Sequence, residues 1–218
     1  MIKHFREAHG FLIAEITGQE KLAFALSEHE DIYDLTEWEK RGGYHGSVIM
    51  FYDFENGLVY QPFDKKRNVI YGKPIFAREA YFFLGADYDA KILKLYRYLP
   101  GGKPETVIDL CIDEIDLYNI ALMGDDVHVV SQGKGAFNCY YPERYSFDLA
   151  PNETADFIDG EKTYIEAWFE EGWDERNNCP SDEYRFYNKV LVKDRTGRVI
   201  SEEIGSIYQD RSGNHWIC

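Results

Sequence analysis

The sequence predicts an all-β protein, built as a meander of short antiparallel strands joined by tight turns. In the stretch 81–112, apolar and polar residues alternate with a period of two, most clearly over 92–99 and 106–113, and this period is typical of strands. Aromatic residues, which favour sheets, make up 16% of the chain. Turn sequences such as Pro100-Gly101-Gly102 recur at short intervals and separate the alternating runs.

The N-terminal part of the chain is predicted to form a hairpin followed by a short helix. Residues 5–16 and 21–27 alternate around a glycine-containing turn and predict a first hairpin. Residues 31–41 break this alternation, because apolar residues recur every three positions from Ile32 to Trp38. A period close to three and a half predicts a short helix at this point.

From residue 47 onward, the pattern predicts short strands closed by tight turns. The clearest turn is Asn56-Gly57, since Asn-Gly between alternating apolar runs is the strongest short hairpin signal. Residues 170–183 are predicted as an acidic loop. The predicted strands are 47–53, 58–63, 68–71, 75–77, 81–84, 92–99, 106–113, 119–123, 127–131, 136–141, 145–149, 154–158, 163–169, 184–193, 198–203, 205–209 and 214–217.

Short strands at regular spacing are found in propellers, barrels and sandwiches. Comparable turns recur about every 40 residues, which is the size of a four-stranded propeller blade. We therefore predict one all-β domain over residues 1–218, built as a small β-propeller. An up-and-down barrel and a β-sandwich are the alternatives.

The run 204–217 carries a recognisable pattern: an apolar strand, the turn Asp210 to Gly213, and then Trp216 and Ile217. It resembles the propeller repeat of two-component sensor proteins, although Gln209 stands where an acidic residue is common in that repeat. The resemblance implies ligand or protein binding at the ends of a central channel. In a closed propeller the final strand would pair with the first hairpin, so we expect these two segments to meet.

The charge balance excludes several classes of partner. The chain carries 39 Asp and Glu against 24 Lys and Arg, a formal net charge of −15. This field repels phosphate backbones and anionic lipid surfaces, so nucleic acid and membranes are not expected partners. The sequence shows no targeting segment and no apolar run of bilayer length, and we expect a cytoplasmic protein. Its four cysteines lie far apart and are predicted to be free thiols.

Recognised catalytic motifs are missing from the sequence. It has no G-x-S-x-G elbow, no phosphate-binding glycine loop and no histidine spacing of the zinc-enzyme kind, so neither a cofactor nor a metal is predicted. Carboxylates are the abundant reactive groups, and a carbohydrate-active hydrolase using a carboxylate pair is the alternative function. The candidate carboxylates are Asp109, Asp113, Asp116, Glu170, Glu171, Asp174 and Glu175.

The segment 168–187 is the best candidate for binding, because aromatic and acidic residues are interleaved there. The predicted binding residues are Trp168, Glu170, Glu171, Trp173 and Tyr184. Such a patch could stack a ligand and hold a cation, whereas the alternative is a solvated loop whose tryptophans pack on the core. We therefore predict a non-catalytic module that binds a protein, or a small-molecule or carbohydrate ligand.

Overall fold

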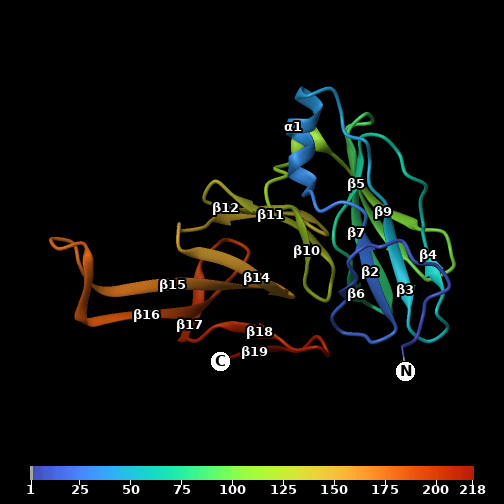
Figure 1. Ribbon diagram of the computed structural model, residues 1–218. Coiled ribbons are helices and arrows are strands. Elements are labelled where there is room, and N and C mark those ends of the chain that lie inside the picture. Colours follow the sequence, from blue (N-terminus) through green and yellow to red (C-terminus); the bar gives the residue numbers. More distant parts are fainter. Residues whose placement is uncertain (1) are drawn as a thin grey trace.

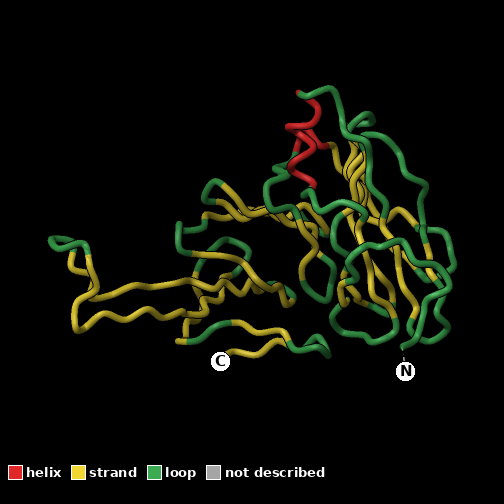
Figure 2. Tube along the Cα trace, viewed as in Figure 1, coloured by secondary structure: helices red, strands yellow, loops and turns green. Residues whose placement is uncertain are grey.

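The computed structural model describes residues 2–218 and confirms the all-β prediction. The strands are short and antiparallel, and the helical segments are η1 (Ile32–Asp34), α1 (Leu35–Lys40) and η2 (Ile112–Glu114) (Figures 1 and 2). No helix in residues 2–218 is long and apolar enough to span a membrane.

The strands form five antiparallel sheets that follow one another along the chain (Figure 1). Sheet A contains β1 (Ala14–Glu15), β2 (Leu22–Leu26), β3 (Ile49–Asp53) and β4 (Val59–Tyr60). Sheet B contains β5 (Val69–Tyr71), β6 (Ile75–Ala77), β7 (Ala80–Asp87), β8 (Ile92–Tyr98) and β9 (Glu105–Cys111). Sheet C contains β10 (Ala121–Met123), β11 (His128–Gly133), β12 (Ala136–Tyr141) and β13 (Tyr145–Asp148). Sheet D contains β14 (Glu153–Asp159), β15 (Lys162–Asp174), β16 (Cys179–Lys193) and β17 (Val199–Ile204), and sheet E contains β18 (Ile207–Gln209) and β19 (His215–Ile217).

Each of the first three junctions between consecutive sheets has its own apolar core. Phe51 of sheet A packs with Phe83 of sheet B, and Leu84 of sheet B shares a cluster with Val129 of sheet C. Sheets C and D share a third cluster, which includes Phe137. Because these sheets are covered on both faces, a central strand such as β7 is buried over nearly its whole length.

Sheet E is joined to its neighbours by hydrogen bonds and by the stacking of His215 on Phe157 of sheet D. The backbone N–H of Ile207 donates to Glu166 of sheet D, at 2.9 Å. On the other side, the N–H of Gly18 donates to the carbonyl of Arg211, at 3.1 Å. In the part of the chain that the structure describes, no residue of β18 or β19 belongs to an apolar core cluster.

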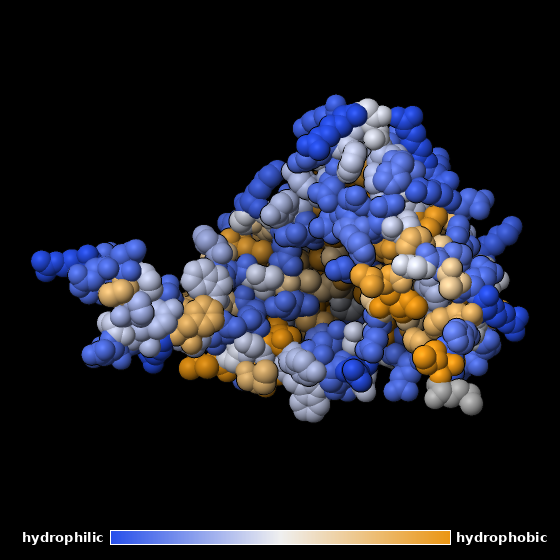
Figure 3. All heavy atoms as spheres, in the orientation of Figure 1, coloured by the Kyte–Doolittle hydropathy of each residue, from blue (hydrophilic) through white to orange (hydrophobic). Residues whose placement is uncertain are grey.

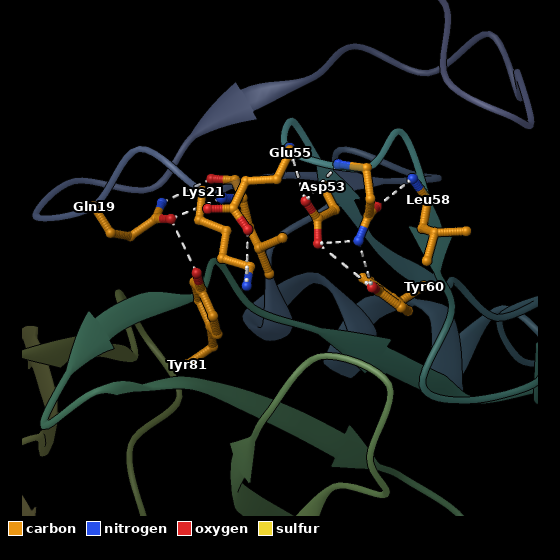
Figure 4. A network of polar contacts seen from close by, with 9 residues as sticks. Gln19, Lys21, Asp53, Glu55, Leu58, Tyr60 and Tyr81 are labelled. Atoms are coloured by element: carbon orange, nitrogen blue, oxygen red, sulfur yellow. Dashed lines mark hydrogen bonds and ion pairs between the residues drawn. The ribbon is translucent and has the colours of Figure 1, made fainter.

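A polar network borders the junction of sheets A and B (Figure 4). The Tyr81 hydroxyl donates to Gln19 at 2.9 Å, and the Gln19 amide in turn donates to two backbone carbonyls. Asp53 is 1% exposed and accepts hydrogen bonds from the Glu55 N–H at 2.9 Å and the Asn56 amide at 3.0 Å. These bonds fix the Asn-Gly turn that the sequence predicted.

All five sheets border one cavity of about 390 Å³. Its wall receives residues from β1, β6, β10, β14 and the β18–β19 hairpin. Segments from the beginning, middle and end of the chain therefore meet at a single central space.

Two expectations about the ends of the chain are wrong. Residues 5–13 form no strand, and Phe5 instead packs against Tyr52 on sheet A, with ring centroids 5.1 Å apart. The final strand, β19, pairs with β18 and not with the first hairpin. What meets that hairpin is the 210–213 turn, in which Asp210 accepts hydrogen bonds from the Asn214 N–H and the Trp216 indole.

The division of the strands among separate sheets also bears on the barrel, one of the two alternative folds. Within residues 2–218 the strands do not close into one barrel, so the barrel alternative is not adopted. The four cysteines are free, as predicted: Cys111, Cys139, Cys179 and Cys218.

Candidate functional site

A two-stranded arm projects from sheet D (Figure 1). Strands β15 and β16 pair from Thr163 and Lys193 outward to Asp174 and Cys179, whereas β14 reaches only to Ala167 along this ribbon. Strand β17 likewise pairs only with 189–193 of β16. We call residues 168–188 the arm, since here both outer neighbours are missing.

The prediction of an acidic loop over 170–183 is therefore wrong. The two strands continue through most of it, and only 175–178 form the turn. Asp174 fixes this turn by accepting hydrogen bonds from the N–H groups of Arg176 and Asn177, at 2.9 and 3.1 Å. A short polar side chain that bonds the backbone two or three residues later favours a turn at this point.

One face of the arm gathers aromatic side chains around a carboxylate. Glu170 lies directly opposite Phe186, and residues opposite each other in an antiparallel pair share a face. Trp168 stacks on Phe186 with ring centroids 6.4 Å apart. The Tyr184 hydroxyl donates to the Glu170 carboxylate at 2.7 Å, which places all four residues together.

A β-bulge adds Trp173 to the same face. The register shifts between Glu171 and Trp173, at Gly172, whose φ is +76°. Here one residue of β15, Gly172, faces four residues of β16 (181–184), which interrupts the regular alternation, and Trp173 packs edge-on against Tyr184 with centroids 6.1 Å apart. A Cβ atom at Gly172 would lie 2.6 Å from the Glu183 carbonyl oxygen, so a larger residue would not fit without displacing the backbone.

These aromatic side chains are only partly covered by the arm itself. The exposed fractions of Trp168, Trp173, Tyr184 and Phe186 are 48%, 42%, 37% and 59%. We call these four residues with Glu170 the aromatic face. None of the four aromatic residues belongs to a core cluster. In the described residues the tryptophans therefore do not pack a loop onto the core, which was the alternative.

Glu171 lies on the opposite face of the arm. It accepts a hydrogen bond from the Tyr187 hydroxyl at 2.6 Å and pairs with the Arg185 guanidinium, and these contacts lower the pKa of its carboxyl group. Of the five predicted binding residues, the structure thus brings Trp168, Glu170, Trp173 and Tyr184 together and separates Glu171 from them. Phe186 was missed, because regular pairing about the 175–178 turn would set Glu170 opposite Glu183, and the register shift beyond Glu171 sets it opposite Phe186 instead.

The arm is strongly acidic. It has six acidic residues and two basic ones, and Figure 3 shows hydrophilic residues covering its tip. The acidic residues are Glu170, Glu171, Asp174, Glu175, Asp182 and Glu183, and the basic ones are Arg176 and Arg185. Arg185 is already paired with Glu171, so a surplus of negative charge remains available on the arm.

The carboxylates proposed for a hydrolase are scattered. Asp109 pairs with Lys94 at 3.0 Å on the surface of sheet B, and Asp174 holds the turn of the arm. Asp113 and Asp116 border a different cavity of about 230 Å³. None of the candidate carboxylates lines the central cavity, whose carboxylates are Glu15, Asp125 and Asp156. Sequence patterns single out none of these three, because they come from β1, the β10–β11 turn and β14, which lie far apart in the chain.

Among residues 2–218, no group of three or more His, Cys, Asp or Glu side chains is arranged to hold a metal ion. A scan of the sequence against models of known protein families finds no match. A comparison with curated proteins finds none either. The function therefore has to be argued from the geometry of the chain itself.

Proposed function

We propose that this protein is a non-catalytic binding module whose arm binds a basic segment of a partner protein. The observation that carries the proposal is the aromatic face, on which four partly exposed aromatic rings surround Glu170. An isolated two-stranded ribbon is marginally stable in water, and exposed apolar patches mark interaction surfaces. A partner lying on this face would cover the rings and stabilise the arm.

The chemistry of the face favours a cationic side chain. Glu170 accepts one hydrogen bond from Tyr184 through Oε1, and a carboxylate has room for several more. A lysine or arginine of the partner could bond Glu170 while its charge lies over the Trp168 or Phe186 ring. The acidic residues of the arm and the net charge of −15 would attract such a segment and repel acidic ones.

The proposal also covers the fold that carries the arm and the location of the protein. We interpret the five successive sheets as the blades of a small propeller in one domain, with sheet E as a two-stranded blade. The apolar clusters between consecutive sheets and the central cavity that all five border support this interpretation. We place the protein in the cytoplasm, where four free cysteines would persist as thiols.

The Trp168→Ala, Phe186→Ala double variant is expected to weaken peptide binding by about 30-fold or more, because buried aromatic anchors dominate binding energies. The probe is a fluorescein-labelled peptide of 12 residues, alternating Lys and Leu, and the measurement is fluorescence anisotropy. Binding to the unmodified protein should weaken as salt is added, since charge attraction contributes.

The matched control is Tyr208→Ala, because Tyr208 is an aromatic residue that is 58% exposed on β18, away from the arm. This variant should bind the peptide like the unmodified protein. The proposal fails if the peptide does not bind, if a Glu-Leu peptide binds equally well, or if Tyr208→Ala has the effect of the double variant. Binding of a neutral oligosaccharide such as cellohexaose, without peptide binding, would reassign the face to carbohydrate.

A further inference from the structure

The central cavity is a second site, separate from the arm. Its volume of about 390 Å³ falls within the range of small-molecule pockets. Two further cavities adjoin it through shared lining residues: one of about 300 Å³ through Glu15 and Gln209, and one of about 530 Å³ through Phe157 and His215. All three cavities are bordered by residues of the β18–β19 hairpin.

The walls of the central cavity combine apolar surface with carboxylates. Apolar side chains from three sheets form part of the wall: Ile75, Phe76, Leu122, Met123 and Phe157. Three carboxylates border it, from Glu15, Asp125 and Asp156, while the basic residue at its wall is Lys73, an exposed side chain. The local charge is therefore negative when all four groups are ionised.

Asp156 owes its position to a bulge in β14. The register shifts between Ala155 and Phe157, so that Asp156 is the extra residue and borders the cavity. The residue is exposed by its accessible surface, but the neighbouring protein atoms partly desolvate its carboxyl group. This partial desolvation, together with the charge of Glu166, raises the pKa of Asp156 to about 6. Within the described chain, no side chain donates a hydrogen bond to this carboxylate, and a backbone hydrogen bond with Glu166 opposes the rise of its pKa.

His215 does not neutralise these carboxylates. Its ring stacks on Phe157 with centroids 3.7 Å apart, on the side of the cavity formed by β19. Burial lowers the pKa of the imidazole, an effect that the charges of Asp125 and Asp210 oppose. The ring is thus expected to be neutral at pH 7, where it can donate one hydrogen bond and accept another.

We propose that the central cavity binds a small organic cation, an ammonium group attached to an apolar body. The ammonium would donate hydrogen bonds to Asp156 and Asp125, which supplies the partner that a desolvated carboxylate needs. The apolar body would lie against Phe76 and Phe157, and aromatic faces also attract cations. An anionic ligand of the same shape would be repelled.

Isothermal titration calorimetry at pH 7.5 with 2-phenylethylamine and 3-phenylpropionate tests this proposal. The amine is expected to bind and the acid is not. Asp156→Asn should weaken amine binding by about tenfold or more, because a hydrogen bond to a charged group contributes strongly. The control Asp64→Asn removes the same charge from an exposed position outside the cavity and should leave the affinity unchanged.

The proposal is overturned if the amine does not bind, if the acid binds as well, or if Asp64→Asn matches Asp156→Asn. The Trp168→Ala, Phe186→Ala double variant should bind the amine normally. The proposal for the cavity and the proposal for the arm are therefore tested independently of each other.

Asp156→Asn is also expected to raise the melting temperature by about 2–4 °C at pH 7. The raised pKa means that the folded state binds more protons than the unfolded state between about pH 4 and pH 6. Stability contributed by Asp156 is therefore greatest below this interval and is lost as the pH rises through 6. The titratable groups that border the cavity with Asp156 are Glu15, Lys73, Asp125 and His215. The charge of Glu166 acts on Asp156 itself, and that of Asp210 acts on His215.

Thermal unfolding of the variant and the unmodified protein at pH 7 and pH 4 measures this effect. Most of the difference should be gone at pH 4, where the Asp156 carboxyl group is neutral in the folded state. A variant that is less stable than the unmodified protein at pH 7 would contradict the desolvation of Asp156.

Discussion

Replacement of Phe83 by alanine is expected to lower the free energy of unfolding by about 3–5 kcal/mol, the usual cost of removing a fully buried aromatic ring. Phe83 is 0% exposed on β7 and lies at the centre of the core between sheets A and B. Five aromatic rings lie around it, with centroid distances from 5.4 to 6.4 Å: Phe51, Phe63, Tyr71, Tyr96 and Tyr98. Urea denaturation followed by circular dichroism measures the loss.

Two further variants make this result interpretable. Phe83→Leu keeps most of the volume and should cost much less, which protects the test if the alanine variant does not fold. Phe186→Ala removes the same ring from the exposed arm and should change stability by less than about 1 kcal/mol. Equal losses at the two positions would show that the core between sheets A and B does not hold the fold together.

Replacement of Lys193 by methionine is expected to lower the free energy of unfolding by about 3 kcal/mol, because it leaves a buried carboxylate without its charged partner. Lys193 Nζ lies 2.5 Å from Glu153 Oε2, and the two side chains are 6% and 10% exposed. Methionine preserves the packing of the aliphatic stem, so the loss reports on the ion pair. Urea denaturation again provides the measurement.

The second half of this test is the Lys193→Met, Glu153→Gln double variant. Glutamine can still accept the hydrogen bond that the Ala150 N–H donates to Glu153, at 2.9 Å. The double variant should recover most of the lost stability, since no unpaired charge remains buried. If it is as unstable as the sum of its single variants, the two residues are not energetically coupled.

Local sequence patterns predicted most of the strands, because the alternation of apolar and polar residues along a strand can be read from consecutive residues of the chain. The strands β7, β8 and β9 and the Asn-Gly hairpin lie where alternation and turn residues placed them. The strand prediction for residues 5–13 was wrong for a physical reason: Phe5 and Phe11 pack on sheet A, while the segment forms no strand and the Arg6 N–H donates to the Gly57 carbonyl at 2.8 Å. A period of two does not distinguish a paired strand from such a segment.

A candidate site was predicted only where its residues lie close together in the sequence. The aromatic face was found in part because Trp168, Glu170 and Trp173 are close in sequence, but the bulge at Gly172 determines which residues share the face. The central cavity could not be predicted, because it depends on how five sheets converge. Asp125 and Asp156 carry no local pattern that points to a common space.

The polar attachment of the β18–β19 hairpin has a consequence for the kinetics of the cavity. Separating this hairpin from sheets D and A breaks a few hydrogen bonds and the stacking of His215 on Phe157, but it opens no apolar core. Segments of this kind undergo local unfolding far more often than the whole domain does. The rate at which a molecule enters or leaves the cavity would then be set by fluctuations of this one hairpin, while the three apolar cores stay intact.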